Sequence, residues 1–489
     1  MRMMVFIFGE TAFRSALRIY LKSKAFGCST RFDFWSAVQQ SLSANHNLNV
    51  TDIMETWVLQ KYYPVVTMKR NGTAIIVTQD KFRLDAQLKP ETSIFGYRWE
   101  IPLTYTTSDE RDFQNRRIIY INRNETETLI ADVLQPPRKD LNSWVIGNIQ
   151  QYGYYRVNYD ITNWNLLIGQ LKHDHTVIPI VNRAQLINDA WNLAKAGVLD
   201  QRVALGTVEY LVKEWAYLPW TTASNELIAL AKILDRTAVY SKFKEFMRRT
   251  LKSHFLHVTW ETGNLSHADE LFRVEIISLA CEFGLPECIE RSRRYFHEWV
   301  NKNGTILHSV APDLRKVIYK TAIKYGDDTE WEFVYRKYKT VESGSERNKL
   351  RMALACSRDM WILKRFLEMT LDPSEIRKQD SSMTIREISS SLLGRQLVWD
   401  FILKRWEDFT KVYGFRILSL SKLLIEITDS FSTMEDYNKL IDFMTQYPEQ
   451  ATKSRAIVQS VEKTLANIHW LKMNLQIISD WLEEQLGNS

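Results

Sequence analysis

The sequence predicts a mainly α-helical protein with a small all-β domain: a short helical segment, a β-sandwich and then an α-solenoid of the HEAT/ARM type. Hydrophobic residues recur at helical spacing near the start and over most of the second half, whereas a stretch between them alternates and is rich in β-branched and aromatic residues. With 489 residues, 45% of them hydrophobic, the chain can bury a large core. The predicted domains are residues 1–48, 49–140 and 141–489.

The first range has a helical pattern. Phe13 and Leu17 lie at helical spacing, and Gly27 interrupts the pattern. No partner for this apolar face is obvious within the range. We interpret residues 1–48 as the last helices of a larger helical unit, and we expect residues 1–45 to be loosely held unless they dock on the sandwich or on another chain.

The second range consists of short runs rich in Val, Ile, Thr, Tyr and Trp, separated by turn residues. The dipeptide Asn71-Gly72 between two alternating runs predicts a β-hairpin. Pro64 and Pro102 suit the first position of a strand or an edge strand, because proline cannot donate a hydrogen bond to a neighbouring strand. These features together predict a small β-sandwich.

The third range is helical almost without interruption from about residue 163 to residue 486. Leu186, Ala190 and Leu193 are one example of the spacing. So many consecutive helices favour a solenoid, in which stacked helical pairs form a concave face. The sequence shows no strict period, so we expect an irregular repeat.

Charge and hydropathy exclude several partners. Lys and Arg total 64 against 58 Asp and Glu, a net charge of +6. Such a small excess over a large surface is far below the clustered positive field that nucleic acids require, so we expect no nucleic-acid partner. No stretch approaches the roughly 18 uninterrupted apolar residues of a membrane helix. The sequence therefore predicts no membrane segment, signal peptide or anchor in this chain.

A zinc peptidase of the helical type needs two histidines four residues apart on one helix face, with a glutamate between them that activates the metal-bound water. No pair of histidines in the sequence has this spacing with its glutamate. The nearest imitation is His297-Glu298-Trp299-Val300-Asn301, in which Asn301 replaces the second ligand. The nine histidines are His46, His173, His175, His254, His257, His267, His297, His308 and His469.

Other catalytic arrangements are also missing from the sequence. His254 and His257 could share a helix face, but no carboxylate or thiolate partner lies near them in sequence. No serine lies in a Gly-x-Ser-x-Gly motif, Cys356 has no neighbouring histidine, and Gly-rich phosphate-binding loops are absent. We therefore predict no catalytic, metal-binding or cofactor-binding residue in this chain.

Six segments resemble one enzyme family. They are WVLQKYYPVV at 57–66, WEIPLTYTT at 99–107, YYRVNYD at 154–160, NRAQLINDAWNLAKAG at 182–197, ALACSRDMWILKRFL at 353–367 and GRQLVWDFILKRW at 394–406. Together they resemble the C-terminal half of the M1 (gluzincin) zinc aminopeptidases of the aminopeptidase N type. Two shorter segments, Arg2-Met3-Met4 and Gly9-Glu10-Thr11-Ala12-Phe13, look like the closing helices of that family's catalytic domain, so the resemblance implies that residues 1–48 are its C-terminal remnant and covers essentially the whole chain. Tyr62 stands where the family usually has Gly, so we expect the turn there to differ.

The resemblance implies an accessory role. In the family, the zinc ligands, the general-base glutamate, the Gly-x-Met-Glu-Asn loop and a transition-state tyrosine all lie upstream of the segment that matches residue 1, so none can be assigned here. We expect zinc in the intact family and no cofactor in this chain. The implied function is that of a half that closes over the active site and limits access, in a parent protein of the plasma membrane or the extracellular space.

A second hypothesis of a different class stays open. The helical array could act without catalysis, as a peptide-binding, dimerisation or receptor module. The expected partners are peptides and, for dimerisation, an intact aminopeptidase or a second copy of the chain. Whether the chain is an enzyme by itself is left open by the sequence, although we expect it to be inactive alone.

The resemblance also implies one disulfide. Cys281 and Cys288 match a short disulfide of the family's helical domain. Gly284 and Pro286 between them would allow the chain reversal that brings the two Cα atoms within bridging distance.

Two further cysteines are expected to be free thiols. Cys356 matches one half of a second family disulfide, but Lys320 stands at the position of its partner, and Cys28 has no assigned partner. The sequence also contains five Asn-x-Ser/Thr glycosylation motifs, which would be used if the chain enters the secretory pathway. These candidates are Asn49, Asn71, Asn124, Asn264 and Asn303.

Polar residues near residue 160 and near residue 182 have a predicted structural role. Asn158 or Asp160 could begin the helix that follows the YYRVNYD strand, and Asn182 suits the cap of the next helix. Asp189 and Trp191 lie deeper in that amphipathic helix.

Overall fold

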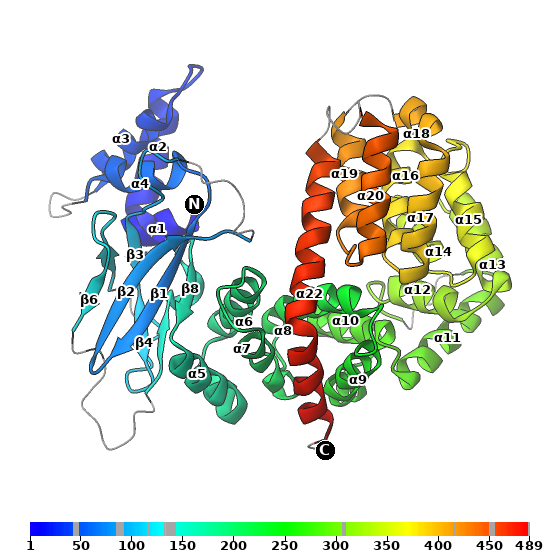
Figure 1. Cartoon of the computed structure of the whole chain (residues 1–489), viewed down its shortest axis with the longest axis horizontal. Helices are drawn as coiled ribbons and strands as arrows, with labels where there is room; N and C mark the ends of the chain where they lie inside the picture. The colour runs from blue at the N-terminus through cyan, green and yellow to red at the C-terminus, as the bar shows by residue number, and fades with distance from the viewer. Residues whose placement is uncertain are drawn as a thin grey trace. The chain divides into compact units, whose positions relative to one another are not determined.

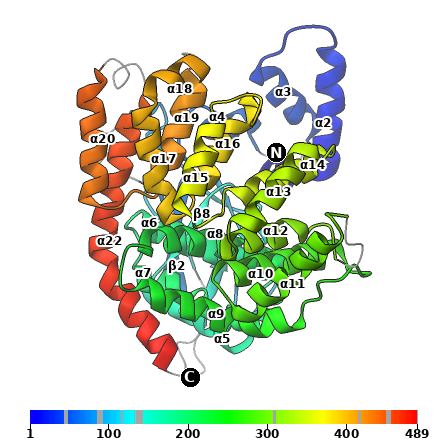
Figure 2. The same cartoon turned by 90° about the vertical axis from the view of Figure 1, so that its right-hand side faces the viewer.

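The computed structural model describes residues 1–42, 48–84, 92–114, 117–131, 133, 143–305, 310–413, 417–448 and 455–487. The chain divides into two compact units, Met1–Tyr210 and Leu211–Ser489, which are described separately (Figures 1 and 2). The described residues are mainly helical with a small β portion, which confirms the predicted fold class. Among them, no helix combines the length and the apolar character needed to cross a membrane.

The first unit begins with four helices that share one core. Two of them begin at recognisable caps: Thr30 and Asp33 form a capping box at the third, and Asn49 accepts a hydrogen bond from the backbone N–H of Asp52 at the fourth. Phe8 and Trp35 lie in their common core. The helices are α1 (Arg2–Phe8), α2 (Glu10–Ser23), α3 (Arg31–Ser41) and α4 (Val50–Val58).

These helices dock on the β-sandwich of the same unit. The guanidinium of Arg2 donates to the carbonyl of Gln150 at 2.7 Å, and the ring of Tyr120 packs against the helical core. The indole of Trp57 donates to the carbonyl of Glu100 at 3.1 Å. We expect the N-terminal helices to be ordered if they dock on the sandwich. Over residues 1–42 the structure shows such docking.

Within the part of the sandwich that the structure describes, there are one four-stranded sheet and two strand pairs. The sheet has the order β6-β2-β1-β8, with β1 and β2 antiparallel and β1 and β8 parallel. The two pairs are β3-β5 and β4-β7. The strands are β1 (Pro64–Asn71), β2 (Ala74–Lys81), β3 (Ile101–Leu103), β4 (Tyr105–Thr107), β5 (Ile119–Ile121), β6 (Thr128–Ile130), β7 (Val145–Gly147) and β8 (Arg156–Tyr159).

Local turn chemistry shapes this sandwich as the sequence predicts. Asn71 pairs with Ala74 across the β1–β2 hairpin, and Gly72 has a φ of +63°, which confirms the hairpin. Pro64 is the first residue of β1. Tyr62 just before it has a left-handed φ of +68°, a conformation for which glycine is the usual residue, and its ring lies 5.6 Å from that of Tyr97.

The structure draws the sandwich boundary differently from the predicted range 49–140. Residue 140 itself lies outside the described residues, but β7 and β8 follow it and pair with sandwich strands. Close packing joins them: a side chain at Gly147 in β7 would collide with Met68 in β1 and crowd Val157 in β8. Strands that return after a long excursion cannot be assigned to a sheet from local spacing, because their partners are distant in sequence.

Three helices complete the first unit. Asp160 caps the first of them by accepting from the backbone N–H of Asn163, as predicted. Asn158 instead accepts from the indole of Trp164. The prediction for Asn182 is wrong, because its helix begins at Ile180 and Asn182 lies inside it. The helices are α5 (Ile161–Asp174), α6 (Ile180–Lys195) and α7 (Gln201–Gly206).

The second unit is built of consecutive helices, many of which pack against the next one or two along the chain, such as α11 against α12 and α13 against α14. They are α8 (Tyr217–Leu234), α9 (Tyr240–His257), α10 (His267–Glu282), α11 (Pro286–Asn301), α12 (Arg315–Tyr325), α13 (Asp328–Thr340), α14 (Gly344–Leu354), α15 (Met360–Met369), α16 (Lys378–Ser389), α17 (Leu392–Lys404), α18 (Trp406–Tyr413), α19 (Ile417–Thr428), α20 (Met434–Gln446) and α22 (Arg455–Gly487).

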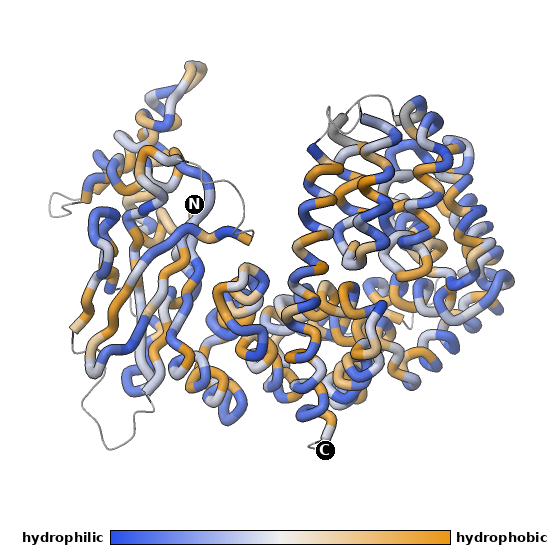
Figure 3. Tube along the Cα trace, in the orientation of Figure 1, coloured by the Kyte–Doolittle hydropathy of each residue, from blue (hydrophilic) through white to orange (hydrophobic). Residues whose placement is uncertain are grey.

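Long-range contacts close this second unit on itself. The last helix, α22, alternates between hydrophilic and hydrophobic turns (Figure 3) and contacts α9 as well as α19 and α20. Near the end of α8, Asp235 pairs with Arg395 of α17 at 2.9 Å, and Arg236 pairs with Asp436 of α20 at 3.0 Å. In an open solenoid, each repeat contacts only its neighbours. The long-range contacts of the second unit go beyond this pattern and hold its helices together as one body.

Candidate functional site

The described residues do not fit a zinc site. Among them, no group of three His, Cys, Asp or Glu side chains is arranged to hold a metal ion. His46 and His308 lie outside the described residues. His173 is exposed near the end of α5, and His267 is exposed and contacts Glu270 at 3.8 Å.

The imitation of a zinc motif on α11 is a surface feature. His297 is exposed, and its ring contacts that of Phe296. Glu298, which would activate water in a peptidase, pairs at 2.9 Å with Lys302, the residue that follows the helix. Asn301 is exposed at the end of α11. This segment therefore lacks both the second ligand and a glutamate directed at a metal.

His254 is the buried histidine of α9, and its two ring nitrogens face backbone carbonyls. Nε2 lies 2.9 Å from the carbonyl oxygen of Glu214, and Nδ1 lies 3.2 Å from that of Thr250. The ring packs against Trp215 and Trp220. Burial lowers the pKa of His254, and the two carbonyls oppose this effect without reversing it. Its nitrogens are thus already engaged in packing the helices.

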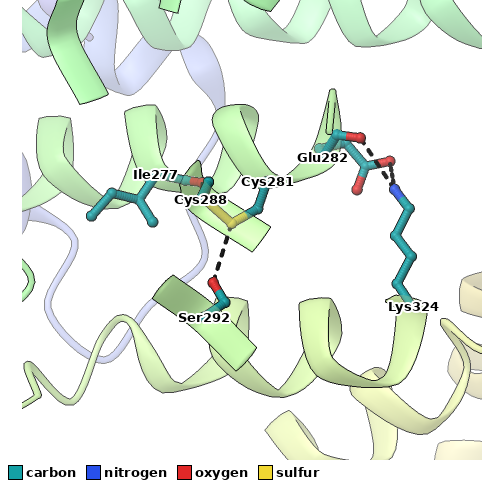
Figure 4. The surroundings of a disulfide bond; sticks show 6 residues. All are labelled: Ile277, Cys281, Glu282, Cys288, Ser292 and Lys324. Carbon is teal, nitrogen blue, oxygen red and sulfur yellow. Dashed lines mark hydrogen bonds and ion pairs between the residues drawn. A yellow bond between two sulfur atoms is a disulfide. The ribbon is translucent and has the colours of Figure 1, made fainter. Parts of the chain in front are cut away.

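The structure joins Cys281 and Cys288 by a disulfide between α10 and α11, with Cα atoms 5.3 Å apart (Figure 4). A disulfide sulfur carries no proton, so the hydroxyl of Ser292 is the donor in its 3.3 Å contact with Cys281. The carbonyl oxygen of Ile277 lies 3.4 Å from the sulfur of Cys288. Since both cysteines are buried, the bond acts as an internal cross-link.

The turn inside this disulfide follows from its sequence. Gly284 has a φ of +79°, and the backbone N–H of Leu285 donates to the carbonyl of Ala280, which ends α10. Pro286 occupies the first turn of α11, where a missing N–H is harmless. Beside the turn, Lys324 pairs with Glu282 at 2.9 Å.

Cys356 and Cys28 are free thiols. Lys320, at the position that the family resemblance assigns to a cysteine partner, donates instead to Glu387 at 2.5 Å. Burial raises the pKa of the Cys356 thiol to about 11, and Lys320 nearby only partly offsets this. A thiol with such a pKa is protonated at neutral pH and is a poor nucleophile. The ion pair between Lys320 and Glu387 links α12 to α16.

The five glycosylation candidates are all exposed. Asn49 has a second role, because its side chain caps α4 and its amide lies 2.7 Å from the carboxylate of Asp52. Asn303 has a left-handed φ of +48° after the end of α11. Ser266, the hydroxyl residue of the Asn264 motif, caps α10. Exposure makes each asparagine sterically available for modification.

A buried polar network between β8 and α6 was missed by sequence reasoning. Arg156 pairs with Asp189 at 3.1 Å, and the same carboxylate accepts from the backbone N–H of Val157. Burial raises the pKa of Asp189 to about 6, while Arg156 and Val157 act in the opposite direction. The amide of Asn182 donates to the carbonyl of Asn148 at 3.2 Å. Asp189 itself, an acidic residue in the middle of α6, was the available signal.

Comparison with known proteins assigns the family. Residues 144–466 match the ERAP1-like C-terminal domain. Aminopeptidase N of Homo sapiens is 35% identical over 498 residues, covering 99% of this chain and 50% of the human protein. Aminopeptidase Ey of Gallus gallus is 31% identical, covering 100% and 50%. The thyrotropin-releasing hormone-degrading ectoenzyme of Mus musculus is 32% identical, covering 98% and 45%.

The chain therefore spans about half the length of the curated relatives that it matches. The matching domain is a C-terminal one, and its range extends from β7 into α22. By these similarities, the chain belongs to the family with an ERAP1-like C-terminal domain and corresponds to the C-terminal half of an M1 aminopeptidase of the aminopeptidase N type.

Proposed function

We propose that the chain is the accessory C-terminal half of a zinc aminopeptidase that removes N-terminal residues from peptides. In this role its helices cover the active site of the other half and limit access of substrates. The observation that carries the proposal is the match of residues 144–466 to an ERAP1-like C-terminal domain within relatives named aminopeptidases. The helical array would serve as the superhelical wall of such a chamber.

Two features of the second unit support this role. The buried pairs Asp235–Arg395 and Arg236–Asp436 tie α8 to α17 and α20, so the helices can act as a single rigid cover. The catalytic machinery would come from elsewhere, because the ring nitrogens of His254 are engaged by carbonyls and His297 lacks a second ligand. We place the complete protein at the plasma membrane or outside the cell, in line with its disulfide and exposed glycosylation motifs.

The test is hydrolysis of alanine and leucine p-nitroanilides by the purified chain with added zinc, with bound metal measured in parallel. We expect no turnover and no stoichiometric zinc. Turnover that rises with one bound zinc per chain would contradict the proposal. The matched control is the Glu298→Gln variant, because activity that depended on the α11 motif would be lost with this glutamate while other activity would remain.

A non-catalytic module is the second candidate, in which peptides, an intact aminopeptidase or a second copy of the chain are the partners. Fluorescence anisotropy with labelled peptides and sedimentation of the chain alone separate the two roles. An accessory half should bind free peptides weakly, because half of the chamber is contributed by other residues. Micromolar peptide binding or stable dimerisation by the chain alone would favour the module instead.

A further inference from the structure

The loop that joins α2 and α3 presents apolar side chains to solvent. We call residues Arg18–Phe32 the α2–α3 tip. Leu21, Phe26 and Phe32 are exposed, and Phe26 is exposed over its whole side chain. In Figure 1 the tip forms the end of the α2–α3 pair that points away from the sandwich strands of the same unit. A cluster of large exposed apolar side chains is a feature of interaction surfaces.

The tip is held in place from both sides. The hydroxyl groups of Tyr20 and Ser29 are 2.7 Å apart, which joins the end of α2 to the loop. Lys24 pairs with Asp33 at 2.7 Å, and Asp33 belongs to the capping box that begins α3. Phe26 itself has a left-handed φ of +58°, which is uncommon for a bulky residue. The structure thus presents the Phe26 side chain to solvent from a loop that these contacts hold.

The surroundings of these apolar residues are basic. Residues 11–32 contain five basic side chains and no acidic one. Three of the five have carboxylate partners: Arg14 pairs with Glu10, Lys24 with Asp33 and Arg31 with Glu55. Arg18 and Lys22 are exposed on α2 and have no ion-pair partner within the described residues. The tip therefore combines exposed aromatic rings with positive charge.

We propose that the α2–α3 tip binds an anionic lipid surface, with Phe26 inserted at the level of the headgroups and Arg18 and Lys22 facing the lipid phosphates and carboxylates. Amphipathic segments with aromatic residues beside a basic face bind membranes in this way. A protein partner would have to bring an acidic and an apolar surface to the tip at the same time. A lipid surface supplies negative charge and an apolar layer together.

Co-sedimentation with vesicles tests the proposal. The full chain is mixed with phosphatidylcholine vesicles and with vesicles in which about one third of the lipid is phosphatidylserine. We expect binding to the second kind and little to the first, and weaker binding at high salt because salt screens the attraction. Since each basic residue near an anionic surface contributes about a fivefold gain in affinity, reversing both Arg18 and Lys22 to Glu should weaken binding at least tenfold.

The apolar contribution is tested separately with Phe26→Ser, which removes no packing within the chain because the ring is exposed. We expect about a tenfold loss of binding to anionic vesicles with unchanged circular dichroism. The matched controls lie outside the tip: Leu129→Ser removes another exposed apolar side chain, on β6, and Lys472→Glu reverses an exposed charge on α22. Both controls should bind like the unchanged chain. Equal losses in tip and control variants would overturn the proposal.

A probe on Cys28 gives an independent readout, because this thiol is exposed within the tip. An environment-sensitive dye attached there should shift its emission to the blue on anionic vesicles and not on neutral ones. If the chain binds neither vesicle, the proposal is wrong. If light scattering instead shows a dimer that Phe26→Ser dissociates, the tip binds a second copy and the lipid assignment is wrong as well.

Discussion

Removing the charge of Asp235 should release one end of the helical array in the second unit. Its partner Arg395 is 1% exposed, and the guanidinium donates to both carboxylate oxygens, at 2.9 and 3.4 Å. Asp235→Asn keeps the shape of the side chain and leaves a buried, uncompensated guanidinium. Breaking a buried pair from one side costs 3–5 kcal/mol, and because Asp235 keeps slight access to water we expect about 3 kcal/mol.

Hydrogen exchange of peptides from α8 and α17 measures this effect locally, which matters because a chain of two units need not unfold in one step. A loss of about 3 kcal/mol corresponds to exchange about 100-fold faster. The control is Glu435→Gln, which breaks the exposed pair with Lys439 on α20 and should change stability by no more than about 0.5 kcal/mol.

Replacing both partners distinguishes charge burial from packing. The double variant Asp235→Leu/Arg395→Met removes the charges and fills the space with apolar atoms, so we expect stability close to that of the unchanged chain. If Asp235→Asn exchanged no faster than Glu435→Gln, the pair would not be holding the helices together. If the double variant were as unstable as the single one, packing rather than an unpaired charge would be the cause.

Four further results are expected. Because burial raises the pKa of Asp189 to about 6 from an unfolded value near 4, its contribution to stability is present below pH 4 and falls by about 3 kcal/mol as the pH rises to 7. In urea titrations, the free energy of unfolding of Asp189→Asn relative to that of the unchanged chain should therefore increase by about 3 kcal/mol between pH 4 and pH 7. If the two chains lost or gained stability in parallel over this pH range, the prediction would be wrong. A thiol reagent at neutral pH should modify the exposed Cys28 rapidly and the less exposed Cys356 slowly, and equal rates would contradict the raised pKa of the Cys356 thiol. Replacing Cys281 and Cys288 by Ser should cost about 2.5 kcal/mol, because their separation of 7 residues closes a short loop, and an unchanged urea midpoint would exclude a role in stability. Asn49→Gln should cost about 1 kcal/mol through the lost α4 cap even without glycosylation, whereas Asn124→Gln, also at an exposed motif, should be neutral in the same titration.

Features whose partners are close in sequence could be predicted. The Asn71-Gly72 hairpin and the Asp160 cap depend on residues within a few positions, so local chemistry decides them. The prediction for Asn182 failed because its hydrogen-bond partner is far away in the sequence. Its amide bonds to the carbonyl of Asn148, 34 positions away, and in a buried site this bond outweighs the preference of Asn for helix starts.

Separation in the sequence also explains why the buried ion pairs of the second unit could not be predicted. Arg395 and Asp235 are 160 positions apart, and Arg236 and Asp436 are 200 apart, so no spacing pattern could pair them. The disulfide could be predicted because its two cysteines are close in sequence, and because Gly284 and the family resemblance both indicate a tight chain reversal between them. The only signal of the Arg156–Asp189 network in the sequence was an acidic residue in the middle of a predicted helix.

Tyr62 shows how distant packing can support an unfavourable local conformation. A left-handed φ costs a residue with a side chain roughly 1–2 kcal/mol relative to glycine. The ring of Tyr62 lies 5.6 Å from that of Tyr97 in an edge-on arrangement, and the ammonium of Lys81 lies 6.0 Å from the centre of the Tyr62 ring. Such aromatic and cation–π contacts contribute about 0.5–1.5 kcal/mol each, enough to offset the strain. The turn before β1 can therefore keep the geometry of a glycine turn while holding a tyrosine.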